Sequence, residues 1–294
     1  MTIFLKSFAL LIRSLPRKLA LIIGMLLGKL MGIILIHKKK ICFLNMDLAF
    51  SDSLSSREKS RIIRKMYVNL GKNIVDFLRI PLISQDNFHQ FVTVEGERFL
   101  VDAREKRKGV LVITAHYGFW DIIPLFFAFR GYGANLITKD IRNASLNDFW
   151  MKYRKYGGVN PIYKKNSSRE MISLLKRNES LGFVIDQNMN SRSGIFVDFF
   201  GVKACTIDVV AKLSQSLECP VLPIFCIRKD DDTFIIRIEE PVLLRQGKDK
   251  QETILLTTQA YTEVLERFII ERPDHWIWMH KRWKTRPEGE ESIY

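Results

Sequence analysis

The chain has 294 residues, enough for one large α/β domain or two smaller ones, and carries 46 Lys and Arg against 32 Asp and Glu. Its formal charge of +14 is outside the usual range for a soluble enzyme and favours an anionic partner: a phospholipid surface, nucleic acid or an acidic protein. The four cysteines are scattered without a Cys-x-x-Cys pair, which argues against a disulfide framework or a zinc site and fits a reducing compartment.

The amino terminus contains a long apolar run, LALIIGMLLGKLMGIILI at residues 19–36, with a single charge at Lys29. As a helix it would just cross about 27 Å of hydrocarbon, although a Lys near the centre costs about 2.5–3.5 kcal/mol on insertion. We expect residues 1–40 to form a helical membrane anchor, either spanning the bilayer or embedded from its cytoplasmic side. Residues 41–294 would then form the second, catalytic unit. The alternative is a buried core helix.

Two details of this run bear on its packing. Gly24, Gly28 and Gly32 are four residues apart, a spacing that lets another helix approach closely. Basic residues flank the run on both sides, at Arg17–Lys18 and in HKKK at 37–40, so they predict no orientation. Each Lys or Arg near an anionic bilayer contributes about 1 kcal/mol of attraction, so these clusters predict contact with anionic lipid.

After the anchor, a capping box at Ser55 and Glu58 begins a helix that ends before Pro81. Strand-like and helix-like stretches then alternate. The expected strands are 109–115, 134–138, 159–163, 181–185, 221–227 and 233–238, and the expected helices are 97–107, 121–130, 146–156, 168–177, 206–217 and 251–271. A second capping box pairs Ser167 with Glu170. This alternation predicts an α/β fold with a central, mostly parallel sheet flanked by helices, and IRKDDDTFIIRI predicts an antiparallel final hairpin.

The stretch ITAHYGFWDII, at residues 113–123, joins a buried strand to a helix through a glycine turn. In a continuous helix, His116 and Asp121 would be about 140° apart, but the turn at Gly118 lets them face each other. His116 would lie at the carboxyl end of a strand, where ligands usually bind in open α/β sheets. A carboxylate beside a His fixes its tautomer and stabilises the imidazolium, so the pair predicts a general base. The alternative is a helix-capping Asp near an unrelated surface His.

Several common site signatures are absent from the sequence: Gly-x-Ser-x-Gly, Gly-Lys-Ser/Thr, Gly-x-Gly-x-x-Gly and His-Glu-x-x-His. With no Ser or Cys nucleophile beside His116, the base would activate a hydroxyl or amine of the substrate itself. The sequence therefore predicts direct group transfer, with no metal and no redox cofactor.

ITAHYGFWD resembles the His-four-residues-acid motif of membrane glycerolipid-type acyltransferases. The chain is more similar still to the bacterial late acyltransferases of lipid A biosynthesis, the lauroyl and myristoyl transferases. The similarity covers nearly the whole chain, including NMDLAF (45–50), DIRNASLNDFWMKYRKYGG (140–158), VIDQNMNSRSGIFVDFFG (184–201), CPVLPIF and HKRWKTRPEGEESIY (280–294). Many members have Glu where this chain has Asp121, and often Asp and Pro where it has Asn188 and Met189.

The resemblance implies a glycerolipid-acyltransferase-like fold and a reaction at His116. This residue would take the proton from a hydroxyl of a lipid A precursor, a Kdo-bearing glucosamine disaccharide, while Asp121 orients it. The oxygen would attack the thioester of an acyl carrier protein, with oxyanion donors from backbone N–H groups near Gly118 or from an arginine. The implied place is the bacterial inner membrane, with the acyltransferase domain on the cytoplasmic side, an anionic bilayer as partner and no nucleic acid.

Further residues are candidates for holding the substrate. Arg142 and Arg154 would bind an acceptor phosphate. Asp186 and Gln187, at the end of the LGFVIDQ strand, would position the acceptor or the dyad. Weaker candidates for binding phosphate are Arg192, Arg282 and Arg286. Asp186 has the alternative of a turn cap, and each arginine that of a solvated surface charge.

Two rival functions remain open. In the first, the chemistry is the same but the acyl acceptor is a glycerol phosphate, a lysophospholipid or a glycolipid mannoside. No Phe-Pro-Glu-Gly-Thr-like block follows the dyad, which argues against the glycerolipid acceptors. In the second, the chain is a non-catalytic basic protein at a membrane surface that binds lipid or nucleic acid. The aromatic residues of FWMKYRKYGG would then stack bases, but Phe149, Tyr153 and Tyr156 also fit the core face of a helix.

Overall fold

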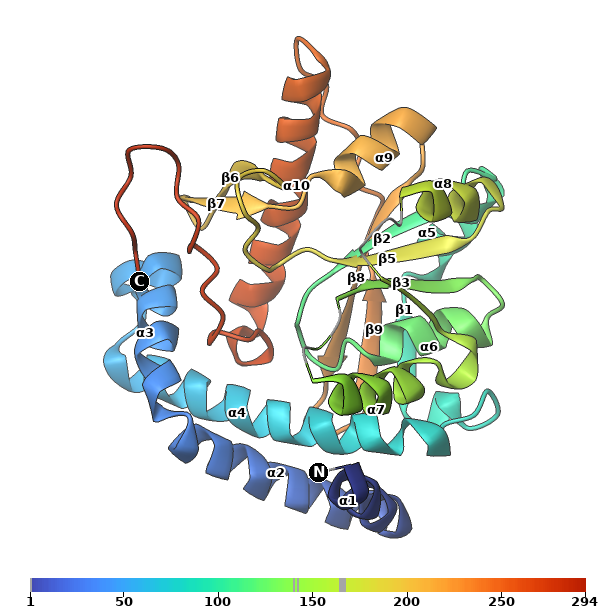
Figure 1. The fold of residues 1–294 in the computed structure, drawn as a ribbon, viewed down its shortest axis with the longest axis vertical. Helices are drawn as coiled ribbons and strands as arrows, with labels where there is room; N and C mark the ends of the chain where they lie inside the picture. Colours follow the sequence, from blue (N-terminus) through green and yellow to red (C-terminus); the bar gives the residue numbers. More distant parts are fainter. Residues whose placement is uncertain (1, 140, 142, 164–167) are drawn as a thin grey trace.

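The centre of the molecule is a seven-stranded sheet, seen in a computed structural model that describes residues 2–139, 141, 143–163 and 168–294 (Figure 1). Its order is β1-β9-β8-β2-β5-β3-β4, and its pairs are parallel except β8–β9, which is an antiparallel hairpin. The strands are β1 (Val92–Glu95), β2 (Val110–Thr114), β3 (Ala134–Thr138), β4 (Asn160–Tyr163), β5 (Ser180–Val184), β8 (Val221–Arg228) and β9 (Phe234–Ile238). Every residue of β2 and β8 is buried, as expected for central strands covered on both faces.

Helices cover the sheet and extend beyond it. Those that follow the first strand are α5 (Glu97–Glu105), α6 (Ile122–Phe129), α7 (Ala144–Arg154), α8 (Ser168–Lys176), α9 (Val209–Leu217) and α10 (Lys250–Glu271). A separate hairpin, β6 (Ile195–Phe199) with β7 (Val202–Thr206), lies against α10, where Gln259 donates to the Asp198 carbonyl. The carboxyl-terminal tail ends beside the amino-terminal helices, where the Tyr294 hydroxyl donates to Asn45 (Figure 1).

Four helices form the amino-terminal part: α1 (Thr2–Ser14), α2 (Arg17–Ile34), α3 (Ile36–Phe50) and α4 (Ser56–Arg79). In Figure 1, α2 and α4 run side by side along one edge of the molecule. The boundary expected after residue 40 lies inside α3. The capping box at the start of α4 is confirmed, because the Ser55 hydroxyl accepts from the Glu58 N–H and the Glu58 carboxylate accepts from the Ser55 N–H.

The alternation read from the sequence is confirmed. Each of the six expected strands and each expected helix is present, with ends that differ by up to three residues, and the final hairpin is antiparallel. The strands β1, β6 and β7 were not predicted; β1 has only four residues, and the other two lie in a Gly-containing motif without a long apolar run. Ser167 of the second expected capping box lies outside the described residues.

The helix α2 packs against α4 through glycines. A Cβ at Gly28 would lie 2.2 Å from the Tyr67 carbonyl oxygen, and one at Gly71 would lie 2.1 Å from the Gly24 carbonyl oxygen. The backbones are therefore too close for any side chain at these points. The close approach expected from the Gly24–Gly28 spacing is confirmed.

The opposite face of α2 is apolar and exposed to solvent. Its exposed residues recur at helical spacing: Leu19, Ile22, Leu26, Leu30, Ile33 and Ile34, joined by Leu10 and Leu11 of α1 and Ile36 of α3. The alternative of a fully buried core helix is therefore wrong. No helix in the described part of the chain is long and apolar enough to cross a bilayer alone; α2 and α3 together reach that length and hydropathy but meet at an 88° bend.

Buried charges join α2 to α4 and to the sheet. Arg17 Nε lies 3.1 Å from Asp76 Oδ1, and Arg228 Nη2 lies 2.8 Å from Asp76 Oδ2. Arg228 also donates to Asn73 Oδ1 at 2.7 Å. Because removing one partner of a buried pair leaves an uncompensated charge, this cluster holds the three elements in one arrangement.

We expect Gly28→Ala to lower the melting temperature of the purified protein by several degrees. The added methyl group has to displace the Tyr67 backbone, and such overpacking costs about 1–3 kcal/mol. Gly32→Ala is the control, because its methyl group would meet only the Tyr67 ring, at 3.3 Å, and would improve helix propensity. Equal melting temperatures for the two variants, measured by scanning fluorimetry in detergent, would contradict glycine-dependent packing.

Candidate active site

His116 lies two residues beyond the end of β2, in a turn that is held from several sides. Gly118 has a φ of +56°, and a Cβ there would lie 1.7 Å from the Cys226 carbonyl oxygen, so only glycine fits. Its carbonyl accepts from Asn73 Nδ2 of α4 at 2.6 Å. Its N–H donates to the His275 carbonyl at 3.0 Å. This N–H is therefore occupied and is not available to an oxyanion. The expectation that oxyanion donors come from N–H groups near Gly118 or from an arginine stays a prediction.

The sheet register brings His116 to Asp186. Thr114 of β2 pairs with Val184 of β5, so both site residues lie two positions beyond one paired rung. His116 Nδ1 is 2.9 Å from Asp186 Oδ1. The other oxygen of Asp186, whose side chain is only 4% exposed, accepts from Trp276 Nε1 at 2.8 Å. The three side chains form a continuous hydrogen-bonded chain.

The electrostatics of the pair fix which ring nitrogen is basic. Burial would raise the pKa of Asp186, but His116 and the Trp276 N–H outweigh it and lower that pKa to about 2. The carboxylate is therefore an acceptor only, and His116 has to carry its hydrogen on Nδ1. Nε2 then holds the lone pair, 3.5 Å from the exposed amide nitrogen of Gln187. Burial would lower the pKa of His116, but Asp186, and more weakly Asp121, shift it upward.

Asp121 has a different partner from the one expected. It stands at the N-cap position of α6, and its Oδ1 is 3.2 Å from Arg154 Nε of α7. Arg154 also donates to Thr138 Oγ1 at 2.7 Å, so its guanidinium connects α6, α7 and β3. The hydrogen bond that orients His116 comes from Asp186 rather than Asp121, which acts on the imidazole through its charge.

The remaining candidates divide into near and distant residues. Gln187 faces His116, whereas Arg192 is exposed in the following loop and its backbone N–H donates to Asn190 Oδ1. Arg142 lies outside the described residues. Arg282 is wholly buried, and its guanidinium donates to the Cys205 carbonyl and the Thr206 hydroxyl. Burial lowers the pKa of Arg282 to about 10.

The tail arginines, which were weaker candidates for binding phosphate, make hydrogen bonds within the protein. Arg282 holds the carboxyl-terminal tail against the β7 end, and Arg286 donates to the Lys203 carbonyl. The tail also fixes the loop after Asp186: Asn188 and Thr285 exchange hydrogen bonds, and the Asn188 N–H donates to His280 Nε2. This loop departs from the family pattern in sequence, and it is nevertheless well anchored.

Two residues of the site were missed from the sequence. Trp276 lies in a tail segment with three tryptophans, HWIWMHKRW, whose density marks it as buried. Asn73 is a buried polar residue on the core face of α4, between apolar neighbours at helical spacing. The signal available in the sequence was an Asn among the apolar residues that recur at helical spacing.

The aromatic residues of the motif have separate places. Phe119 and Phe126 are buried in the core, whereas Trp120 is half-buried with its ring edge-on to His116, 5.0 Å between centroids. Trp120 also borders a narrow apolar cavity of about 30 Å³ between α6 and the strands β2, β3 and β5.

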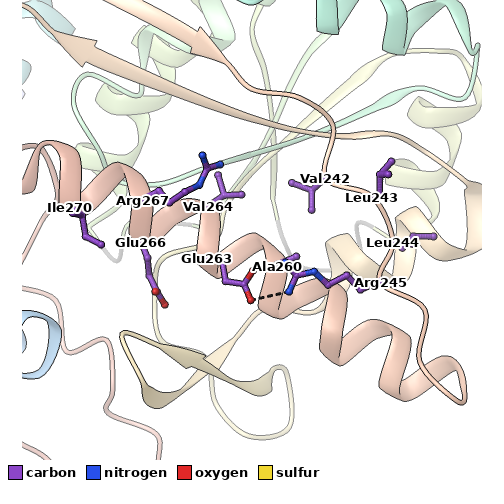
Figure 2. Close-up of a pocket in the computed structure, with 10 residues that line it drawn as sticks. All are labelled: Val242, Leu243, Leu244, Arg245, Ala260, Glu263, Val264, Glu266, Arg267 and Ile270. Carbon is purple, nitrogen blue, oxygen red and sulfur yellow. Dashed lines mark hydrogen bonds and ion pairs between the residues drawn. The ribbon is translucent and has the colours of Figure 1, made fainter.

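A larger hollow lies elsewhere, between α10 and residues 242–245 (Figure 2). It measures about 560 Å³, and Figure 2 shows the ion pair between Arg245 and Glu263 on its wall. None of the candidate site residues lines it. Within the described part of the chain, no cluster of His, Cys, Asp or Glu has the composition of a metal site.

The chain is similar in sequence to known acyltransferases. Residues 1–285 match the family model described as "Bacterial lipid A biosynthesis acyltransferase". The chain is 24% identical over 288 residues to the lipid A biosynthesis lauroyltransferase of Escherichia coli (strain K12), covering 97% of this chain and 91% of that protein. The palmitoleoyltransferase of the same organism is 23% identical (96% and 90% covered), and its myristoyltransferase 21% (91% and 82%).

These similarities define the chain as an acyltransferase. More particularly, the chain belongs to the bacterial lipid A biosynthesis acyltransferase family. The resemblance carried by the sequence motifs is confirmed.

We expect Asp186→Asn to shift the pH dependence of acyl transfer. A general base has to be neutral, and the raised pKa of His116 places the acid limb of kcat/KM above pH 6.5 in the wild type. Removing the Asp186 charge lowers the pKa of His116, so the limb moves to lower pH. The maximal rate also falls, by roughly 10²–10⁴-fold, because the tautomer is no longer fixed.

Asp121→Asn is the comparison for this experiment. It also lowers the rate, because it releases Arg154, but it shifts the acid limb less, since Asp121 makes no hydrogen bond to His116 among the described contacts. A larger shift for Asp121→Asn than for Asp186→Asn would contradict the assignment of Asp186 as the direct partner.

Proposed function

We propose that the chain transfers a fatty acyl group from acyl carrier protein to a hydroxyl of a lipid A precursor. The observation that carries this proposal is the His116–Asp186–Trp276 chain, which leaves Nε2 as the base beside the half-buried Trp120. The names of the relatives support lipid A as the product class. Transfer is direct, because no Ser or Cys nucleophile contacts His116 among the described residues.

The reaction proceeds by one addition and one elimination. Nε2 of His116 takes the proton from the acceptor hydroxyl, and the oxygen attacks the thioester carbonyl. The tetrahedral intermediate collapses as its C–S bond breaks, and the imidazolium returns the proton to the leaving thiolate. Asp186 stabilises the imidazolium throughout, and Arg154, held by Asp121, supplies a fixed positive charge at the same edge of the sheet.

Membrane attachment follows from the amino-terminal helices. The exposed apolar faces of α1 and α2 would be costly in water and are stabilised when they lie in the bilayer. The formal charge of +14 favours both an anionic membrane and an acidic carrier protein. These features support a location at the inner membrane of a bacterium, with the site on the cytoplasmic side, where acyl carrier protein is available.

The first test is transfer of a labelled acyl chain from acyl carrier protein to a Kdo-bearing lipid A precursor. We expect His116→Ala to reduce product by about 10²–10⁴-fold, because the base is lost. His89→Ala is the matched control, since His89 is exposed and lies outside the site. Full activity of His116→Ala would overturn the mechanism, whereas wild-type transfer only to another lipid would overturn the acceptor.

A further inference from the structure

A deep basic groove lies on the amino-terminal side of the molecule, away from the candidate active site. It has a volume of about 790 Å³ and is bounded by α2, the start of α3, the first two-thirds of α4, the β8–β9 turn and the end of α10. Its lining carries nine Lys and Arg against three Asp, namely Lys29, Lys39, Arg61, Arg64, Lys65, Lys72, Arg228, Lys229 and Arg272 against Asp230, Asp232 and Asp274. This composition predicts an anionic ligand.

The cations of this groove differ in their partners. On the sheet side they are paired: Arg228 and Lys72 with Asp232, and Arg272 with Asp274. On the helical side, five cations lie beyond salt-bridge distance of any described carboxylate: Lys29, Lys39, Arg61, Arg64 and Lys65. Like charges repel, so a ligand that neutralises these cations would stabilise their arrangement on three adjoining helices.

The hollow beside α10 shows the opposite arrangement. There Arg245 pairs with Glu263, as Figure 2 shows. Arg267, on the same wall, pairs with Glu239. The two hollows therefore differ in how the arginines that line them are paired.

The same groove has an apolar border. Ile33 and Ile36, which line it, are 71% and 66% exposed, and they continue the exposed face of α2. Gly28 and Gly32 leave the wall between them and α4 without side chains. A ligand that fills the groove therefore meets cations on one side and aliphatic surface on the other.

We propose that the basic groove binds an anionic phospholipid, with its phosphate against Arg61, Arg64 and Lys65 and its acyl chains along α2. An acidic protein such as acyl carrier protein would match the charge, but it would leave Ile33 and Ile36 facing polar surface. A phospholipid satisfies both borders of the groove. The inference rests on the membrane association proposed above and not on acyl transfer.

This lipid site is separate from the catalytic one. None of His116, Trp120, Asp121, Arg154, Asp186 and Gln187 lines it. Along α4, Lys65 in the groove is about 18 Å from Phe77, which borders the cavity of Asp121 and Arg154. The nearest link between the two sites is His275, which lines the groove and whose carbonyl accepts from the Gly118 N–H.

The test measures lipid bound to the full-length protein in mild detergent by native mass spectrometry. Phosphatidylglycerol is titrated against phosphatidylcholine, with inorganic phosphate and glycerol phosphate as soluble probes. The variant Arg61→Gln/Arg64→Gln/Lys65→Gln is compared with Arg245→Gln/Arg267→Gln/Lys248→Gln, which removes the same number and kind of exposed cations elsewhere. We expect the groove variant to bind phosphatidylglycerol roughly 10²-fold more weakly and the control to match the wild type.

A second variant, Ile33→Gln/Ile36→Gln, tests the apolar border and should weaken phosphatidylglycerol without changing the binding of glycerol phosphate. Equal phosphatidylglycerol affinity in all variants would overturn the proposal. So would a groove variant that keeps its lipid but has a raised KM for acyl carrier protein, because the groove would then bind protein. Glycerol phosphate bound as tightly as the lipid would assign a soluble ligand. A wild type that binds lipid but transfers no acyl chain would count against the proposed function alone.

Discussion

The geometry of the site depends on one backbone turn, at Gly118. Its Cα faces the Cys226 carbonyl of β8, its own carbonyl is held by Asn73 of α4, and its N–H is held by the His275 carbonyl near the tail. Three elements distant in sequence thus position the residue two places after His116. The sheet register sets Asp186 opposite His116, so Nδ1 of the imidazole is held as well as the backbone turn that follows it. Both contacts exist before a substrate arrives, which is the preorganisation that a general base needs.

The same helix, α4, connects this turn to the apolar amino terminus. The side-chain oxygen of Asn73 accepts from the Arg228 guanidinium, and its amide nitrogen donates to the Gly118 carbonyl. Asp76 pairs with both Arg228 and Arg17. The charges are buried and mutually compensating, so each is costly to remove alone. The glycine contacts of α2 with α4 add to this coupling. The helix with the exposed apolar face and the turn that follows His116 are therefore parts of one packed unit.

The order of strands and helices could be predicted because each element has a strong local pattern, as in the apolar run of β2 and the capping box of α4. His116 and Asp121 could be found because they lie within one short motif. The partner of His116 could not be assigned from local spacing, because Asp186 comes from a strand seventy positions away and register decides the contact. For Arg282, charge alone suggested a surface role, whereas the fold buries it and satisfies it with backbone carbonyls.

The charged residues around His116 and those of the basic groove are arranged differently. Around His116 each charge has a partner: Asp186 with the imidazole, and Asp121 with Arg154. An unpaired cation beside His116 would lower the pKa of the imidazole, as Arg154 already does weakly. It would also attract a phosphate to the place where the acceptor hydroxyl has to bind. The unpaired cations of the basic groove lie on α2, α3 and α4, beside the exposed apolar face. The cations proposed to attract an anionic lipid are therefore different from the one that pairs with Asp121 beside His116.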